Sequence, residues 1–393
     1  MYNQSMTDNS MWQFPRLKRI VSGRGFCVIA IVAFSLLTAV EGTWGFGIHR
    51  SPVMWVTAIA MLVSLGLVIF DSIREKHTVS GTLSHIGMFL LMLGTLWSAP
   101  FIVDVQMIVS AESEERNAFS REGSIVSLPF SIRLEEFRID YYDDEVSPKQ
   151  YTSTLMIEGN ELRTSVNHPC HYKGYYIYQS DFDRDSQSYS VLKLVRDPWL
   201  PLIFLGFLLL ASGAVLSLKH HWNSWYALAV TGVVALIFGV ISLARINFGT
   251  LMPALRSLWF IPHIALYMLA YSSLGLAFVI GCISHFSKKP DNKLWSLSSR
   301  LFHTASSLLL LGMICGAVWA KVAWGDWWTW DAKECWAAVT WLLTLTGTHL
   351  PLQWKKRNKA VLICMLLSFI AMQIAWYGVD LLPAAQYSLH TYR

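Results

Sequence analysis

Residues 200–217 read LPLIFLGFLLLASGAVLS, a run of 18 residues without a single charged side chain. About 20 consecutive apolar residues are enough to cross the hydrocarbon core of a bilayer as a helix. The whole chain agrees with this local signal, because 54% of its 393 residues are hydrophobic, 15% are charged and its mean hydropathy is +0.40. We therefore expect a polytopic α-helical membrane protein that lies in a lipid bilayer.

Similar apolar runs on both sides of this segment predict about nine transmembrane helices. The first is too long, and too poor in small residues at a cleavage position, to be a removable signal peptide. The expected spans are 26–48, 53–70, 84–103, 198–218, 223–243, 258–284, 301–322, 333–350 and 360–380.

The short loops predict how these spans are oriented, because Lys and Arg accumulate on the cytoplasmic side of a membrane. Basic residues precede the first span and follow the second, fourth, sixth and eighth, so all fall on one side. We expect a cytoplasmic N-terminus, with the C-terminus and the long loop 104–197 outside. The net charge of +5 reflects this pattern. We therefore expect no nucleic-acid partner.

The loop 104–197 breaks the membrane pattern. Runs such as QYTSTLMIE and SYSVLKLV alternate apolar and polar residues, which is typical of half-buried antiparallel strands. We expect a small β-rich domain, either a sandwich or a curled sheet, that also leans on the membrane part. His168 and His171 are interpreted as solvated loop residues, and the six cysteines show no spacing typical of disulfides or zinc.

The segment 324–334, WGDWWTWDAKE, contains four tryptophans and two aspartates within eight residues. Such a cluster offers a broad apolar surface with polar groups beside it, which favours a platform for a planar cofactor. The alternative is an aromatic belt at the membrane interface, where Trp is enriched. Asp331 also fits a helix N-cap, with Glu334 three residues later as its capping-box partner.

Four histidines stand out because an ionisable residue within a membrane is costly and is often functional. His85 and His349 lie at the expected cytoplasmic ends of their spans, whereas His263 and His390 lie at the expected outer surface. Neutral imidazole is the usual axial ligand of haem iron, so two pairs at two depths favour haem binding. Taken singly, each histidine is more often structural. The others are interpreted as edge residues, namely His77, His220, His221, His285 and His303 on the cytoplasmic flanks and His49 at an outer edge.

At this point the residues resemble a known family. WGDWWTWDAKE resembles the WWD haem-handling motif of the CcsA/ResC proteins, and LRSLWFIPH and SLHTYR resemble its flanking segments with external histidines. SHIGMFLLMLG, LPFSIRLEEFRID, YTSTLMI and VNHPCHYKGYYIYQ resemble the CcsB/ResB partner. The chain thus resembles a fused CcsBA, the system II cytochrome c synthase. It departs from the family in Ala332, where Pro is usual, and in a much shorter external domain.

The resemblance implies four regions in a bacterial cytoplasmic membrane. Residues 1–103 would be ResB/CcsB-like transmembrane helices, 104–197 the external domain, and 198–222 the helix that closes the CcsB-like part. Residues 223–393 would be the CcsA/ResC-like haem-handling part.

The resemblance also implies a function, in which haem b is a transported substrate. It would enter from the cytoplasmic side between His85 and His349 and move to an external site, where His263 and His390 ligate the iron. Two thiols of a CXXCH segment in apocytochrome c would then add to the haem vinyl groups, with thiol-reducing proteins as further partners. The macrocycle would be lined by Trp324, Trp327, Trp328 and Trp330, and oriented by Asp326 and Asp331. His263, His390, Trp327, Trp328 and Asp331 are the expected catalytic residues.

Two alternatives remain open from the sequence. A haem exporter or holdase would use the same sites without attaching the haem. A transmembrane electron carrier would hold two permanent haems, one in each histidine pair. In each case most of the chemistry belongs to the haem, as is common for cofactor reactions.

Overall fold

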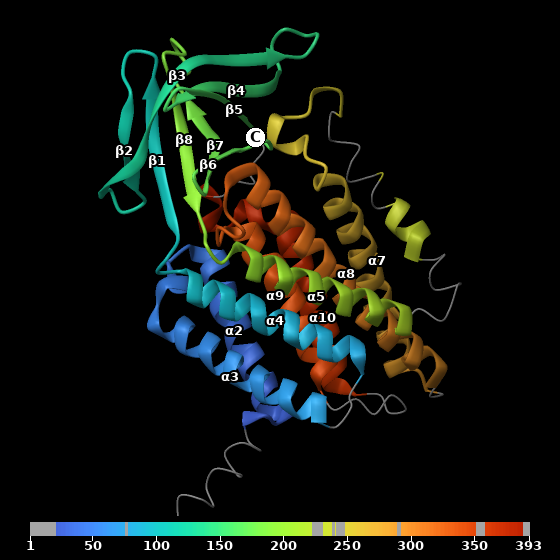
Figure 1. Cartoon of the computed structure of the whole chain (residues 1–393). Helices are drawn as coiled ribbons and strands as arrows, with labels where there is room; N and C mark the ends of the chain where they lie inside the picture. Colours follow the sequence, from blue (N-terminus) through green and yellow to red (C-terminus); the bar gives the residue numbers. More distant parts are fainter. Residues whose placement is uncertain are drawn as a thin grey trace, which may run out of the picture.

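The computed structural model describes residues 21–74, 78–221, 231–237, 240, 248–288, 292–350 and 358–387. Figure 1 shows a bundle of helices with a β-sheet at one end. The long helices are α2 (Arg24–Trp44), α3 (Pro52–Arg74), α4 (Val79–Ser98), α5 (Leu200–His221), α7 (Phe260–Phe286), α8 (Asn292–Trp324), α9 (Ala332–His349) and α10 (Lys359–Gln373).

Seven helices among the described residues are long and apolar enough to cross a membrane, which supports the predicted polytopic membrane protein. They are α2, α3, α4, α5, α7, α8 and the helix that begins with α10 and continues to Leu381. The expected span 333–350 is helical as α9, which is not among these seven. The expected span 223–243 lies largely outside the described residues. The count of nine therefore stays a prediction.

The segment between α4 and α5 forms one eight-stranded antiparallel sheet, in the order β5-β4-β3-β2-β1-β8-β7-β6. The strands are β1 (Val103–Ser110), β2 (Glu115–Ser120), β3 (Ile125–Tyr141), β4 (Pro148–Ile157), β5 (Asn160–Ser165), β6 (Cys170–Tyr172), β7 (Tyr175–Phe182) and β8 (Tyr189–Arg196).

The sheet is curled, because its two edges approach each other. Thr164 Oγ1 on β5 donates a hydrogen bond to the Ile177 carbonyl on β7 at 2.7 Å, and Ser165 forms an isolated bridge with His168. Alternate residues of the strands fill one apolar core, in which Phe130 and Leu155 are fully buried. The predicted β-rich domain is confirmed, and of the two forms expected for it, a sandwich or a curled sheet, it has the second.

Small residues bring the N-terminal helices against the C-terminal ones. A Cβ on Gly87 of α4 would lie 2.5 Å from the Leu210 nitrogen of α5, so these two backbones are in direct contact. Such close approach through small residues is typical of helix pairs in membranes. A Cβ on Gly42 of α2 would likewise lie 2.5 Å from Cys335 Cβ on α9. The first helix of the chain therefore packs directly on the helix that follows the Trp-rich segment.

Candidate functional site

The structure brings the predicted inner histidines together at the ends of α4 and α9 that lie away from the sheet. The ring centroids of His85 and His349 are 6.2 Å apart, with their planes inclined at 49°. His349 Nδ1 lies 2.9 Å from the Leu345 carbonyl, so Nδ1 carries the proton and donates it there. Its Nε2 then carries the lone pair that a metal requires.

His303 on α8 is a third histidine near this pair. Its Nδ1 lies 2.8 Å from the Ser299 carbonyl, and His349 is one of its electrostatic neighbours. The sequence places His303 near an expected span boundary. Because α8 begins nine residues earlier than the expected span 301–322, His303 lies within a helix rather than at its edge.

The Trp-rich segment 324–330 is a tight loop between α8 and α9. Gly325 has φ +81° and Trp330 has φ +62°, so the chain passes twice through the left-handed region. That region is unusual for a bulky residue such as Trp330 and marks a backbone held by its surroundings. The Asp331 carboxylate accepts the Glu334 amide at 2.8 Å, which confirms the predicted N-cap. Glu334 Oε2 in turn accepts Thr329 N at 2.7 Å and Thr329 Oγ1 at 3.0 Å.

The tryptophans of this loop point in different directions rather than forming one flat surface. Trp327 packs against Phe204 and Phe207 of α5, with centroids 5.2 and 5.1 Å away. Trp324 contacts Trp319 at 5.4 Å, and Trp328 meets the edge of Trp330 at 6.2 Å. The expectation that all four line one macrocycle therefore stays a prediction. Their directions depend on the two positive φ angles, which the sequence pattern does not reveal.

A cavity of about 790 Å³ opens beside this loop, between the sheet and α2. Its volume is within the range of roughly 300–1,000 Å³ that is usual for small-molecule and cofactor sites. Two of the four loop tryptophans, Trp324 and Trp330, lie on its wall. The other walls include Glu41 and His49 from the N-terminal helices, Asp104, Arg121, Tyr178 and Lys193 from the sheet, and Asp326 and Asp331 from the loop.

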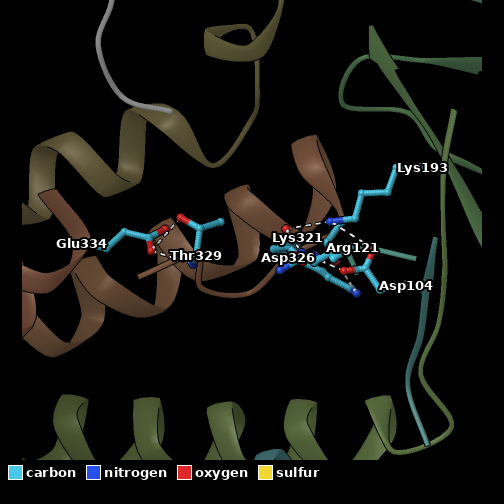
Figure 2. A network of polar contacts seen from close by, with 8 residues as sticks. Asp104, Arg121, Lys193, Lys321, Asp326, Thr329 and Glu334 are labelled. Carbon is cyan, nitrogen blue, oxygen red and sulfur yellow. Dashed lines mark hydrogen bonds and ion pairs between the residues drawn. The ribbon is translucent and has the colours of Figure 1, made fainter. Parts of the chain in front are cut away.

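Asp326 ties the loop to the sheet (Figure 2). Its two carboxylate oxygens each accept Arg121 Nη2 at 2.9 Å, and Oδ2 accepts Lys193 Nζ at 2.6 Å. Asp104 completes the group, at 2.7 Å from Arg121 and 3.6 Å from Lys193. Lys193 is only 7% exposed, so its charge depends on these partners. The sequence could not reveal this network, because Arg121 and Asp326 are 205 residues apart.

The predicted external histidines are not brought together within the described residues. His263 lies between α7 and α8, where Nδ1 is 2.9 Å from the Gly312 carbonyl and the ring is 4.8 Å from that of Tyr267. Trp319 links it to the loop, because the Trp319 ring is 5.8 Å from that of His263 and also contacts Trp324. His390 lies outside the described residues. Ligation by these two residues stays a prediction.

His49, interpreted above as an edge residue, lies just beyond the end of α2 and also forms part of the cavity wall. Its ring stacks on Trp330 at a centroid distance of 5.4 Å and an interplanar angle of 10°. The exposed positions of His168 and His171 on the sheet agree with their interpretation as solvated residues.

Comparison with known proteins divides the chain into two parts. Residues 79–188 match the ResB-like family, and residues 199–385 match the family described as Cytochrome C assembly protein. The chain is a fused CcsBA-type protein. This confirms the resemblance given by the sequence motifs. Within this CcsBA-type chain, His85 comes from the ResB-like match and His349 from the cytochrome c assembly match.

Several curated relatives named "Cytochrome c biogenesis protein CcsA" match the second part. The relative from Prochlorococcus marinus strain MIT 9312 is 32% identical in an alignment 180 positions long, and this alignment covers 37% of this chain and 57% of that protein. The relative from Hordeum vulgare is 33% identical over 140 residues, 35% of this chain and 42% of that protein. The CcsBA-type chain thus spans about half the length of the curated relatives it matches.

Proposed function

We propose that this protein matures cytochrome c by carrying haem b from the inner histidine pair to the external cavity and attaching it to CXXCH of an apocytochrome. The family and the names of the curated relatives support the general role in cytochrome c biogenesis. The observation that carries the haem proposal is the meeting of His85 and His349, one from each family match, at 6.2 Å between ring centroids.

This spacing fits a metal held by two opposed imidazoles. A metal–imidazole bond is about 2 Å, and the ring centre lies about 1 Å behind the nitrogen, so two such rings have centroids about 6 Å apart. The distance between the two rings is thus compatible with one iron between them. Helix α9 separates the pair from the cavity by about 25 Å, given its 18 residues. Two haem positions on opposite sides of a bilayer fit that separation.

In this proposal the chain contributes mainly binding and orientation, while the haem and thiols supply the chemistry. The thiol hydrogen of each substrate cysteine and its sulfur add across one vinyl double bond, so no oxidant is consumed. His263 and His390 remain the proposed external ligands. Trp327 and Trp328, with Asp331, would hold the macrocycle in place. The proposed orientation puts the sheet and the loop 324–330 outside a bacterial cytoplasmic membrane, where thiol-reducing proteins would keep the substrate cysteines reduced.

The test is co-expression with an apocytochrome carrying CXXCH in a bacterium that lacks its own maturation system. We expect haem that stays on the cytochrome after denaturing electrophoresis. His85→Ala and His349→Ala should each lower that signal at least tenfold, because one imidazole alone holds the iron weakly. His171→Ala, which alters an exposed ring on β6, is the matched control and should leave the signal unchanged.

The other functions give different outcomes. Haem on the purified chain, without haem-stained cytochrome, would indicate an exporter or holdase. Haem that stays bound and shuttles electrons across vesicles would indicate an electron carrier. Equal cytochrome maturation by the wild-type chain and both inner-pair variants would rule out the proposed inner site.

A further inference from the structure

His49 is carried by a short turn at the end of α2 that has no role in the function proposed so far. The chain leaves α2 through Gly45 and Gly47, which have φ of +67° and +73°, and forms a 3₁₀ turn at η1 (Ile48–Arg50). The two positive φ angles fold η1 back against the end of α2. This return places His49 beside Glu41, eight residues earlier, and in the wall of the external cavity.

The Glu41 carboxylate fixes the orientation of the His49 ring. Glu41 is 3% exposed, and its Oε1 lies 2.8 Å from His49 Nδ1. Its Oε2 accepts the Ile48 amide at 2.6 Å, so both carboxylate oxygens are engaged. The His49 proton is then on Nδ1, and Nε2 carries the lone pair. Nε2 accepts Arg50 Nε at 3.2 Å, and Arg50 is exposed, so another partner can replace this bond at little cost.

This arrangement is the one that proteins use for imidazoles that bind metals. A ligating histidine usually donates its second ring nitrogen to a carboxylate or carbonyl, which fixes the tautomer and makes the ligating nitrogen more basic. The carboxylate of Glu41 lies in an apolar helix, where a buried acid is costly and is often functional. A role in packing alone would not require this charge.

The surroundings of the ring identify the ligand. His49 stacks on Trp330, whose backbone is held at φ +62°, and both residues line the cavity of about 790 Å³. Among the described residues of the cavity wall, His49 is the only histidine, whereas His263 lies behind Trp319. A planar metal complex in this cavity would thus lie within reach of the imidazole of His49.

We propose that His49 is an iron ligand for haem in the external cavity and that Glu41 is its positioning residue. This inference rests on the proposed function, in which haem reaches the cavity, and adds to it an imidazole from the N-terminal helices. His49 can hold the iron while an external ligand leaves and the histidine of CXXCH arrives, so that the iron keeps an imidazole throughout.

The test isolates the external cavity by using the full chain with the inner pair and one proposed external ligand replaced, His85→Ala together with His349→Ala and His390→Ala. The purified protein in detergent is titrated with ferric haem, and the Soret band and the electron paramagnetic resonance spectrum are recorded. We expect one saturable low-spin site. Adding His49→Ala should weaken haem binding at least tenfold and convert the iron to high spin, and free imidazole should restore the low-spin spectrum. His171→Ala should change nothing.

A second variant separates ligation from folding. Glu41→Gln keeps the shape of the side chain but removes its charge, so we expect haem to bind with a smaller low-spin fraction while the protein elutes as one species. A low-spin site unchanged by His49→Ala would overturn the inference and leave the proposed function standing. A loss that imidazole does not restore would mean that the ring only supports η1, which also overturns it. No saturable site in the starting protein would overturn the external site itself.

Discussion

Cys170 shows how burial controls a reactive side chain in the external domain. It lies on β6 as a free thiol, and burial raises its pKa to about 11. Only the thiolate is an effective nucleophile, so the reactive form of Cys170 is scarce at neutral pH. A protein proposed to handle substrate thiols next to this domain would therefore not compete with them through its own cysteine.

A chain that retains Cys170 as its only cysteine should react with a maleimide at pH 7.5 about a hundredfold more slowly than an ordinary thiol. The sign follows from the raised pKa: the rate should increase with pH and level off only near pH 11. Labelling in urea-denatured protein is the control and should be fast. Fast labelling of the folded protein at pH 7.5 would contradict the expected burial.

At this scale the sequence predicted the inner site but not His49. His85 and His349 are found from residue type and depth alone, because ionisable residues within apolar spans are rare. His49 stands out only when it is considered together with Glu41. Glu41 is the acidic residue inside the first apolar span, so the sequence does show it. Its presence in a membrane helix was the signal that could have found the Glu41–His49 pair.

Among the elements, α9 depends on a single residue for its start. Asp331 follows Trp330 and caps the helix by accepting the Glu334 amide. Asp331→Ala should lower the free energy of unfolding by about 1 kcal/mol, whereas Asp331→Asn should retain most of it, because an amide oxygen also caps. Thermal unfolding in detergent measures both. If Asp331→Asn lowers the free energy of unfolding as much as Asp331→Ala does, the negative charge of Asp331 stabilises α9, and the hydrogen bond of the cap does not.

The sequence pattern does not predict β1 and β6, and the reason is physical in each case. β1 begins only five residues after α4 ends, so its apolar residues look like the end of a membrane span. β6 has three residues, too few to show an alternating pattern. The longer runs QYTSTLMIE and SYSVLKLV do alternate, and they predicted β4 and β8. Short strands are formed through their neighbours, which only the folded structure supplies.

In the whole molecule, Asp326 holds the sheet on the loop 324–330. Asp326→Ala removes one of the two carboxylates that pair with Arg121, and it leaves buried Lys193 with Asp104 at 3.6 Å. We expect a loss of about 2 kcal/mol, as for a hydrogen bond to a charged group, and faster hydrogen exchange in β1 and β8. Lys193→Met should show the smaller effect, because it removes the charge together with its need for a partner.

The matched control is Asp140→Ala, which breaks the exposed pair with Arg138 on β3. Exposed ion pairs contribute about 0–1 kcal/mol, so this variant should unfold almost as the wild type does. Equal exchange in β1 and β8 for Asp326→Ala and Asp140→Ala would show that the sheet is held by other contacts.

The position of Gly42 against Cys335 has a consequence for biogenesis. Helix α2 is synthesised early, yet its partner α9 emerges from the ribosome almost three hundred residues later. Until α9 is made, the part of α2 that carries Glu41 lacks its packing partner. The external cavity then also lacks the wall formed by the loop before α9. The cavity proposed to take up haem is therefore complete only after translation is nearly finished, so a half-made chain would lack the proposed site for a reactive iron porphyrin.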